Sequence, residues 1–196
     1  TEGLPIGYIY GYQTNGIFQN QGEVSAYTLT DSLGVVAIAQ PDAVAGDFKF
    51  KDTNGDGVID ADDRTIIGNP TPDFTFGFTA NAAYKGWDIS VFLQGMAGND
   101  IFNATRRYDL PTANMPASAL NRWTGEGSTN QYPRLTMNDV NRNYARSSDF
   151  YVEDGSFARI KNFQLGYNVK SAFLEKLGII KFRTYYSGNN LLTFTG

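Results

Sequence analysis

Twelve consecutive residues, Asp52 to Asp63, have the residue types and spacing of a calcium-binding EF-hand loop. With Asp52 as position 1, oxygen-bearing side chains occupy positions 1, 3, 5, 9 and 12, and the sharp-turn glycine occupies position 6. A hard cation needs about six to eight oxygen ligands, and a tight turn lets alternate residues converge on it. The predicted calcium ligands are Asp52, Asn54, Asp56, the backbone carbonyl of Val58, Asp60 and Asp63.

This loop departs from a calcium-sensor loop in two ways. Position 12 is Asp63, where sensor loops have Glu, so bidentate closure around the ion is less favoured. Residues 46–51, which precede the loop, alternate in the manner of a strand and show no helix-entry pattern. These features predict a structural calcium staple within residues 52–63 rather than a signalling switch. A solvated Asp- and Gly-rich turn without metal is the alternative that the sequence leaves open.

The composition excludes several classes of function. The chain has 196 residues, of which 16 are basic and 20 are acidic. Its net charge of -4 gives no indication of a surface that binds nucleic acid. It has no Cys and no His, so disulfides, thiolate metal sites and the commonest general base are absent. We therefore predict that the chain is not an enzyme. Glycoside hydrolysis by paired carboxylates, such as Glu126 or Glu153 with Asp154, is the enzymatic alternative.

The clearest periodic signal covers residues 74–94. From Phe74 to Tyr84 one parity is apolar throughout, and after the turn Lys85-Gly86 the alternation resumes from Trp87. This pattern predicts a hairpin of two strands of about ten residues, long enough to cross a bilayer when tilted. Tyr84 and Trp87 would lie at the turn as an interfacial girdle. A soluble sandwich, in which the apolar face packs on a second sheet, is the alternative for this hairpin.

Residues 96–150 lose the alternation and are predicted to form a long loop with a short helix near 118–123. Loops of this length are uncommon in compact soluble domains and are usually functional. The length of this loop therefore disfavours the sandwich. The side chains that are candidates either for binding a ligand or partner or for packing the loop are Arg106, Arg107, Arg122, Trp123 and Arg134.

Alternation returns in the last third of the chain. A strand is predicted from about residue 156 to 169, with a phase change that indicates a bulge near Lys161-Asn162. A Ser start and a Gly stop predict a short connecting helix over 171–178. Over 180–186, Lys and Arg fall on the face opposite the apolar residues. A polar barrel lumen tolerates such charges, whereas a dry sandwich core does not.

Seven short motifs occur along the chain in one order. They are Gly3-Leu4-Pro5-Ile6-Gly7, Gly46-Asp47-Phe48-Lys49 with the Asp-rich loop, Tyr84-Lys85-Gly86-Trp87-Asp88, Arg122-Trp123-Thr124-Gly125-Glu126-Gly127, Glu153-Asp154-Gly155-Ser156-Phe157, Leu165-Gly166-Tyr167 and Ser187-Gly188-Asn189-Asn190-Leu191-Leu192. In this order they resemble the C-terminal part of SusC/RagA-type TonB-dependent transporters, and the resemblance covers nearly the whole chain.

The resemblance implies an all-β fold, with long antiparallel strands that belong to a transmembrane barrel of about 22 strands and with long extracellular loops. It implies a location in the outer membrane of a Gram-negative, Bacteroidetes-type cell, in contact with its lipid. The implied partners are a SusD-like surface lipoprotein and TonB, which would act through regions outside this chain. The implied cargo is an oligosaccharide or a peptide.

The sequence shows no signal peptide, plug or TonB-contact segment and has too few strands to close a large barrel. Residues 1–196 are therefore predicted to be a C-terminal segment of a longer polypeptide. Because short turns of such barrels are periplasmic, Lys85-Gly86 and the 169–179 connection are expected inside, and residues 96–150 and the Asp-rich loop outside. The alternative function is a soluble, secreted, calcium-stabilised β-domain that binds carbohydrate.

Overall fold

The computed structural model describes residue 3 and residues 6–110 and 114–195. Leu4 and Pro5 of the first motif, and Gly196, lie outside the described residues. The chain divides into two compact units. We call residues 1–70 and 101–153 the loop unit and residues 71–100 and 154–196 the sheet unit. None of the described helices is long and apolar enough to cross a membrane.

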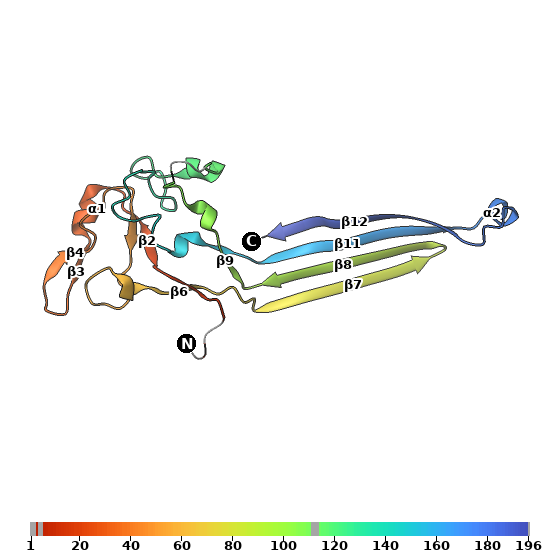
Figure 1. Cartoon of the computed structure of the whole chain (residues 1–196), viewed down its shortest axis with the longest axis horizontal. Helices are drawn as coiled ribbons and strands as arrows, with labels where there is room; N and C mark the ends of the chain where they lie inside the picture. The colour runs from red at the N-terminus through yellow and green to blue at the C-terminus, as the bar shows by residue number, and fades with distance from the viewer. Residues whose placement is uncertain (1–2, 4–5, 111–113, 196) are drawn as a thin grey trace. The chain divides into compact units, whose positions relative to one another are not determined.

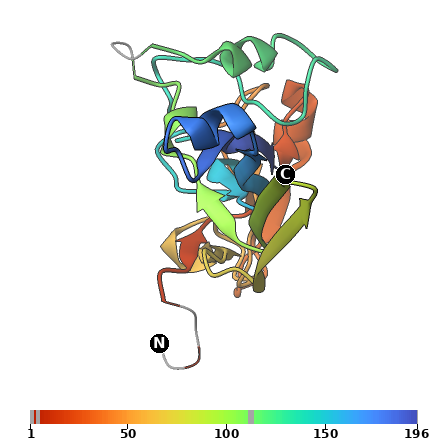
Figure 2. The same ribbon diagram turned by 90° about the vertical axis from the view of Figure 1, so that its right-hand side faces the viewer.

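The sheet unit is one antiparallel sheet with the strand order β12-β11-β8-β7 (Figure 1). Its strands are β7 (Phe74–Tyr84), β8 (Trp87–Ala97), β11 (Phe157–Val169) and β12 (Phe182–Thr195). Lys85 and Gly86 join β7 to β8 with φ of 47° and 91°, the two positive values that a type I′ hairpin turn requires. The short helix α2 (Ala172–Lys176) joins β11 to β12 and lies in front in Figure 2. The predicted hairpin and connecting helix are confirmed.

The register of this sheet aligns an apolar row from each of the four strands on one face. Val91 pairs with Phe163, and Ile89 pairs with Leu165. The register shifts between Ile160 and Asn162, so that Ile160 lies opposite Leu93. The predicted bulge therefore explains why the sequence changes phase while the apolar face continues.

The two faces of this sheet differ in chemistry. The apolar face is open to its surroundings, with Phe78 60% and Ile89 37% exposed, and the described strands of the unit form one sheet without a facing layer. On the other face, Arg183 reaches Asp88 at 2.6 Å across Gly166, where a Cβ would lie 2.5 Å from the guanidinium. A sandwich would bury the first face, so the structure does not support that alternative for the hairpin.

The loop unit is built from short elements around aromatic side chains. Its strands form the pairs β1-β6, β2-β5 and β3-β4, and the pair β9-β10 lies in it except for the end residues Asp100 and Asp154. The strands are β1 (Ile9–Gly11), β2 (Thr14–Ile17), β3 (Thr28–Thr30), β4 (Val36–Ile38), β5 (Phe48–Phe50), β6 (Thr65–Gly68), β9 (Asp100–Phe102) and β10 (Val152–Asp154). The helices are α1 (Gln21–Ala26) and the 3₁₀ helices η1 (Ala61–Asp63), η2 (Ala104–Arg106), η3 (Ala117–Asn121) and η4 (Asp149–Tyr151).

The core of the loop unit joins its two chain segments. Phe150 from the second segment packs against Phe48 from the first, with ring centroids 5.1 Å apart, and against Tyr132, Tyr144 and Tyr151. Phe48 and Phe150 are buried. The stretch predicted as a long loop is therefore irregular in backbone and yet anchored to a core, because its aromatics are buried without any regular spacing.

Helix α1 was not predicted, whereas the short helix predicted near 118–123 corresponds to η3. The N-cap of α1 is Asn20, whose side chain accepts a hydrogen bond from the Glu23 N–H. The Glu23 carboxylate in turn accepts from the N–H of Gln19. The sequence signal was the pair of a capping Asn and a Glu three residues later.

Candidate functional site

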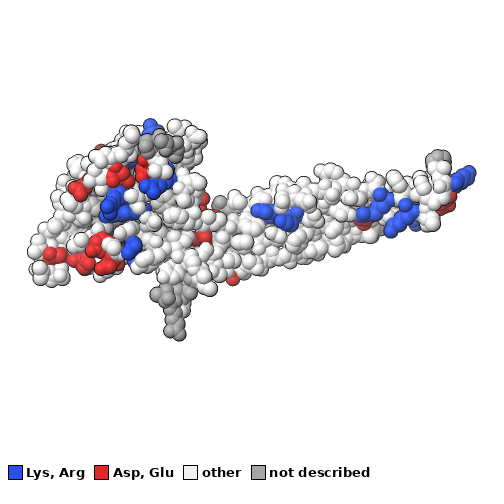
Figure 3. Space-filling model, in the orientation of Figure 1, with Lys and Arg blue, Asp and Glu red and all other residues white. Residues whose placement is uncertain are grey.

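The Asp-rich loop connects β5 to β6 within the loop unit. Asp56 and Asp60 are exposed, whereas the Asp63 side chain is fully buried. Acidic side chains visible in Figure 3 gather on the part of the loop unit that carries this loop. The segment before it is strand β5, as the sequence predicts, so the loop is not flanked by an EF-hand helix on that side.

Hydrogen bonds to the carboxylates at both ends close the loop. The N–H groups of Gly55 and Gly57 donate to the Asp52 carboxylate at 2.6 and 2.9 Å. The N–H groups of Thr53 and Asp60 donate to the Asp63 carboxylate, both at 2.8 Å. The loop therefore has the tight turn that the spacing predicts, held by charge-assisted hydrogen bonds.

The predicted calcium ligands lie on this loop, but their carboxylates do not converge. Across the described ranges, no three His, Cys, Asp or Glu side chains are grouped closely enough to hold a metal ion. The Asn54 amide donates to the Asp56 carboxylate at 2.9 Å, so these two predicted ligands bind each other. Asp63 makes no salt bridge among the described residues. The donor set suits calcium in chemistry, and calcium binding stays a prediction.

The loop packs closely against the end of β3. A Cβ at Gly57, where φ is 87°, would lie 2.5 Å from the carbonyl oxygen of Thr30. Gly57 is therefore required both for the turn and for this approach. Tyr27 donates to the carbonyl of Phe50 at 2.7 Å, and burial, followed by the charges of Asp52 and Asp63, raises the pKa of its hydroxyl.

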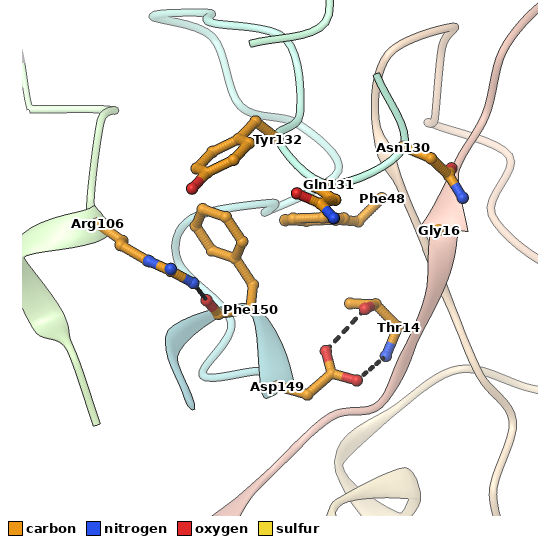
Figure 4. Close-up of a pocket in the computed structure, with 9 residues that line it drawn as sticks. All are labelled: Thr14, Gly16, Phe48, Arg106, Asn130, Gln131, Tyr132, Asp149 and Phe150. Carbon is orange, nitrogen blue, oxygen red and sulfur yellow. Dashed lines mark hydrogen bonds between the residues drawn. The ribbon is translucent and has the colours of Figure 1, made fainter. Parts of the chain in front are cut away.

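A cavity of about 360 Å³ also opens in the loop unit (Figure 4). On one side Asp149 accepts hydrogen bonds from the N–H and the hydroxyl of Thr14, at 3.0 and 2.7 Å. On the other side Arg106 donates to the carbonyl of Phe150 at 2.7 Å and forms an ion pair with Glu153 at 2.7 Å. The charged side chains that line this cavity are thus held in place by the protein.

Three polar side chains from one segment complete the cavity wall. Asn130 accepts the N–H of Ile17 at 2.8 Å, and Gly16 permits this approach, because a Cβ there would lie 2.6 Å from the Asn130 side chain. The Gln131 amide and the Tyr132 hydroxyl form no hydrogen bond with the part of the chain that the structure describes. The cavity therefore presents free polar groups beside aromatic rings, an arrangement suited to binding.

Most of the arginine and tryptophan side chains that were candidates for binding a ligand or partner instead make packing contacts within the loop unit. Arg107 pairs with Asp109 at 2.9 Å, and Arg134 pairs with the fully buried Asp47 at 2.6 Å. The Trp123 indole donates to the Gln19 side chain at 3.3 Å. Arg106 is the member of this set that lines the cavity of Figure 4. The cavity residues Thr14, Asn130, Gln131, Tyr132 and Asp149 were not predicted, because they come from three segments that share no motif.

The carboxylates proposed for glycoside hydrolysis have other roles. Glu126 accepts a hydrogen bond from the Asn20 amide at 2.8 Å. Glu153 accepts from Asn103 at 3.0 Å besides its ion pair with Arg106. Asp154 accepts the N–H of Ser156 at 2.8 Å. Each of these carboxylates therefore has a partner within the protein.

Comparison with known proteins decides the family. No protein-family model matches the chain. TonB-dependent receptor P3 of Formosa agariphila is 38% identical to it over 195 residues, which make up 99% of this chain and 18% of that receptor. The chain belongs to the TonB-dependent receptors. TonB-dependent receptor SusC of Bacteroides thetaiotaomicron is 26% identical over 122 residues, 62% of this chain and 12% of SusC.

Solved structures agree with this family in fold. The RagAB peptide transporter matches 96% of the chain with a TM-score of 0.63 and 23% identity, over 19% of that structure's chain. The RagAB peptide importer in its open-open state matches 95% of the chain with a TM-score of 0.61 and 21% identity, also over 19%. The predicted all-β barrel fold is confirmed, and the number of strands in the complete barrel stays a prediction.

The family also confirms the predicted location. TonB-dependent receptors are β-barrel proteins of the outer membrane and are not enzymes, so this receptor segment is part of an outer-membrane barrel. It spans about a fifth of the length of the receptors that it matches, 18% in the case of receptor P3. A soluble secreted domain, the alternative drawn from the sequence, is inconsistent with this location.

Proposed function

We propose that the receptor to which this segment belongs imports oligosaccharides or peptides across the outer membrane with a SusD-like surface lipoprotein. TonB would supply the energy through regions outside this chain. The observation that carries the proposal is the sheet unit, whose apolar face continues across four strands in the register of a barrel wall. The kinship with SusC and the other TonB-dependent receptors supports the same function.

Connection lengths support an orientation for the segment. The β7-β8 turn has two residues, Lys85 and Gly86, and the β11-β12 connection is short and carries α2. Trp87 and Tyr167, whose ring centroids are 4.6 Å apart, lie at this end as an interfacial aromatic pair. Since barrels of this kind have short periplasmic turns, we place this end in the periplasm and the loop unit on the cell exterior.

In this orientation the loop unit is the part of the segment that meets cargo or the lipoprotein. The cavity of Figure 4 offers the Gln131 amide and the Tyr132 hydroxyl as hydrogen-bonding groups. Such groups fit the hydroxyls of a sugar and the amides of a peptide equally well. The chemistry of the cavity therefore supports a polar cargo without choosing between these two classes.

The proposal is tested with the full-length receptor in its own outer membrane. We expect a SusD-like lipoprotein to co-purify with the affinity-tagged receptor, and uptake of labelled oligosaccharides or peptides to stop when the receptor or TonB is deleted. Complementation with the wild-type receptor is the matched control. A receptor that purifies alone, in cells whose uptake of both cargo classes is unaffected by its deletion, would contradict the proposal.

We also propose that calcium orders the Asp-rich loop as a structural staple. Support comes from the ligand spacing and from Asp63, a buried carboxylate with hydrogen bonds but no cation partner among the described residues. Asp52, Asp56, Asp60 and Asp63 would hold the ion together with Asn54 and the Val58 carbonyl. The bound charge would offset the repulsion among these carboxylates.

Chelation tests the staple. In the full-length receptor, replacing Asp52 and Asp56 with Ala should increase proteolysis of residues 52–63 without preventing barrel insertion. Asp62→Ala, which removes an exposed acid at a position that is not a ligand, is the control and should behave as wild type. Identical thermal unfolding of the wild-type receptor with calcium and with a chelator would refute the staple.

A further inference from the structure

Arg146 in the loop unit stacks its guanidinium on two aromatic rings. The guanidinium carbon lies 4.6 Å from the ring centroid of Phe50 and 5.1 Å from that of Tyr12. The ring of Phe50 is fully buried. Cation–π contacts of this kind hold an arginine in one place when the site is shielded from water. The Arg146 charge therefore has a fixed position at the edge of the core.

This fixed charge lacks a partner in the protein. Arg106 and Arg134 each hold a carboxylate, at 2.7 and 2.6 Å. In contrast, the Arg146 side chain makes neither an ion pair nor a hydrogen bond with any described residue, and its Nη1 is sealed from solvent. A buried donor on a charged group costs free energy when it has no hydrogen-bond partner. Burial also lowers the pKa of Arg146, as expected for a cation without a partner.

Arg146 lines a separate cavity of about 260 Å³. Two polar side chains in its wall are already satisfied: the Gln40 amide donates to Asn141 at 2.8 Å and accepts the N–H of Phe50 at 2.7 Å. Asp42, which is exposed, also lines the cavity without forming an ion pair with Arg146. The remaining walls are mostly apolar and include Val58 and Ile59 of the Asp-rich loop.

We propose that this cavity binds an oxyanion, either a carboxylate or a sulfate group, through the Arg146 guanidinium. The planar guanidinium matches the paired oxygens of such a group and supplies a charge that is not paired within the described residues. Since one water takes up about 30 Å³, the cavity has room for the anion and part of a larger molecule that carries it. The inference does not depend on the import function proposed above.

Two kinds of ligand carry such an oxyanion, and they differ in size. One is a free inorganic anion, and the other is the acidic group of a larger ligand such as an acidic sugar. Asp42 opposes both, because its negative charge lies in the same cavity wall. Asp42→Asn should therefore tighten anion binding about threefold or more.

The test titrates the purified full-length receptor with sodium sulfate, sodium acetate and sodium glucuronate at a constant ionic strength set with sodium chloride. Calorimetry should show saturable binding of at least one of these anions to the wild type. The variant Arg146→Met, which keeps the aliphatic part of the side chain but removes the charge, should weaken anion binding at least about tenfold. The variant Arg146→Lys should bind the anion with intermediate affinity, because lysine keeps the positive charge but lacks the paired N–H groups of the guanidinium.

Arg64→Met is the matched control. Arg64 also lies over a tyrosine ring, at 5.7 Å from Tyr10, but its side chain is exposed and donates to the carbonyl of Ala61. This variant should bind anions as the wild type does. Tighter binding of glucuronate than of sulfate identifies an acidic sugar as the source, and the reverse order identifies a free anion.

Two results would overturn the inference. One is a wild-type receptor without saturable binding of any of the three anions. The other is unchanged affinity in Arg146→Met. If Arg146→Met does not fold, the variant Asp42→Asn decides the question. Tighter anion binding by this variant supports the site. A lower unfolding temperature without tighter binding shows that Asp42 is the internal partner of Arg146 and contradicts the proposed anion site.

Discussion

Every buried apolar side chain among the described residues lies in the loop unit, whereas the sheet unit exposes a continuous apolar face. In the loop unit, Phe48, Phe50 and Phe150 pack on one another and on tyrosines. In the sheet unit, Phe78 and Ile89 on neighbouring strands remain 60% and 37% exposed. The loop unit is thus built to be stable in water, and the sheet unit requires an apolar surrounding that the outer membrane supplies.

The polar side chains of the two units show the same contrast. The loop unit buries Asp47 completely and satisfies it with Arg134, Asn143 and the N–H of Val44. The sheet unit keeps its ion pair, Asp88 with Arg183, on the partly exposed face opposite the apolar one. A buried charge must be matched inside the protein, whereas a charge that faces a wet lumen is solvated.

The largest effect should come from removing the central ring of the loop unit. Phe150→Ala deletes a buried ring that contacts Phe48 and four tyrosines, and should destabilise the loop unit by about 3–5 kcal/mol. Proteolysis of residues 101–153 in the full-length receptor should accelerate while the barrel stays inserted. Leu120→Ala, at a 75% exposed position, is the control and should have little effect. If the variant destabilised the sheet unit together with the loop unit, the contrast between the two units would be contradicted.

The apolar face of the sheet unit should reject charge. Val91→Arg places a cation on the lipid-facing side and should cost about 2–4 kcal/mol of folding free energy near the membrane centre. Ser90→Arg, one residue earlier and on the opposite face, should cost much less. Urea titration of the receptor refolded into lipid vesicles measures both variants. Equal destabilisation by the two arginines would show that neither face meets lipid.

The buried ion pair should matter more than an exposed one in the same unit. Arg134→Met leaves the Asp47 carboxylate without its cation and should destabilise the loop unit by about 1.5–3 kcal/mol. Arg107→Met removes the exposed pair with Asp109 and should change stability by less than about 1 kcal/mol. Thermal unfolding of the loop unit, followed by near-ultraviolet circular dichroism, compares them. Similar shifts would mean that Asp47 is adequately satisfied by its other donors.

Alkaline pH should loosen the loop unit selectively. Burial raises the pKa of the hydroxyls of Tyr144 and Tyr151 above their ordinary value of about 10. The unfolded state therefore loses these protons first, and the stability present below about pH 10 falls as the pH rises further. Tyrosinate absorbance should rise together with proteolysis of the loop unit. Tyr144→Phe should make this pH dependence shallower, and an unchanged profile would exclude Tyr144 as its source.

The sheet unit was largely predictable from sequence because each strand carries its own period-two signal. The turn at Lys85-Gly86 and the bulge near Lys161 could also be located, because each interrupts the alternation of the sequence at its own position. Strand β12 was the exception: alternation predicted residues 180–186, whereas the strand runs from Phe182 to Thr195. Asn190, with a φ of 53°, interrupts the regular alternation there.

The loop unit could be predicted only in parts. The Asp-rich loop has a fixed spacing and was located correctly, with its tight turn held by hydrogen bonds to Asp52, and its calcium site stays a prediction. The cavity of Figure 4 and the core around Phe150 join segments more than 100 residues apart, as in the Thr14 contact with Asp149. Such contacts depend on long-range packing, for which a single sequence carries no local pattern.

The most direct test of the contrast between the units is a scan of β8 with single spin labels in the full-length receptor embedded in lipid vesicles. The segment has no Cys, so labels can be attached at residues 89–94 one at a time. Collision with oxygen, which is concentrated in lipid, should be high at Ile89, Val91 and Leu93, and collision with a water-soluble nickel complex should be higher at Ser90 and Gln94. Uniformly low collision with both reagents at Ile89, Val91 and Leu93 would show that this face is buried against protein and would contradict the account.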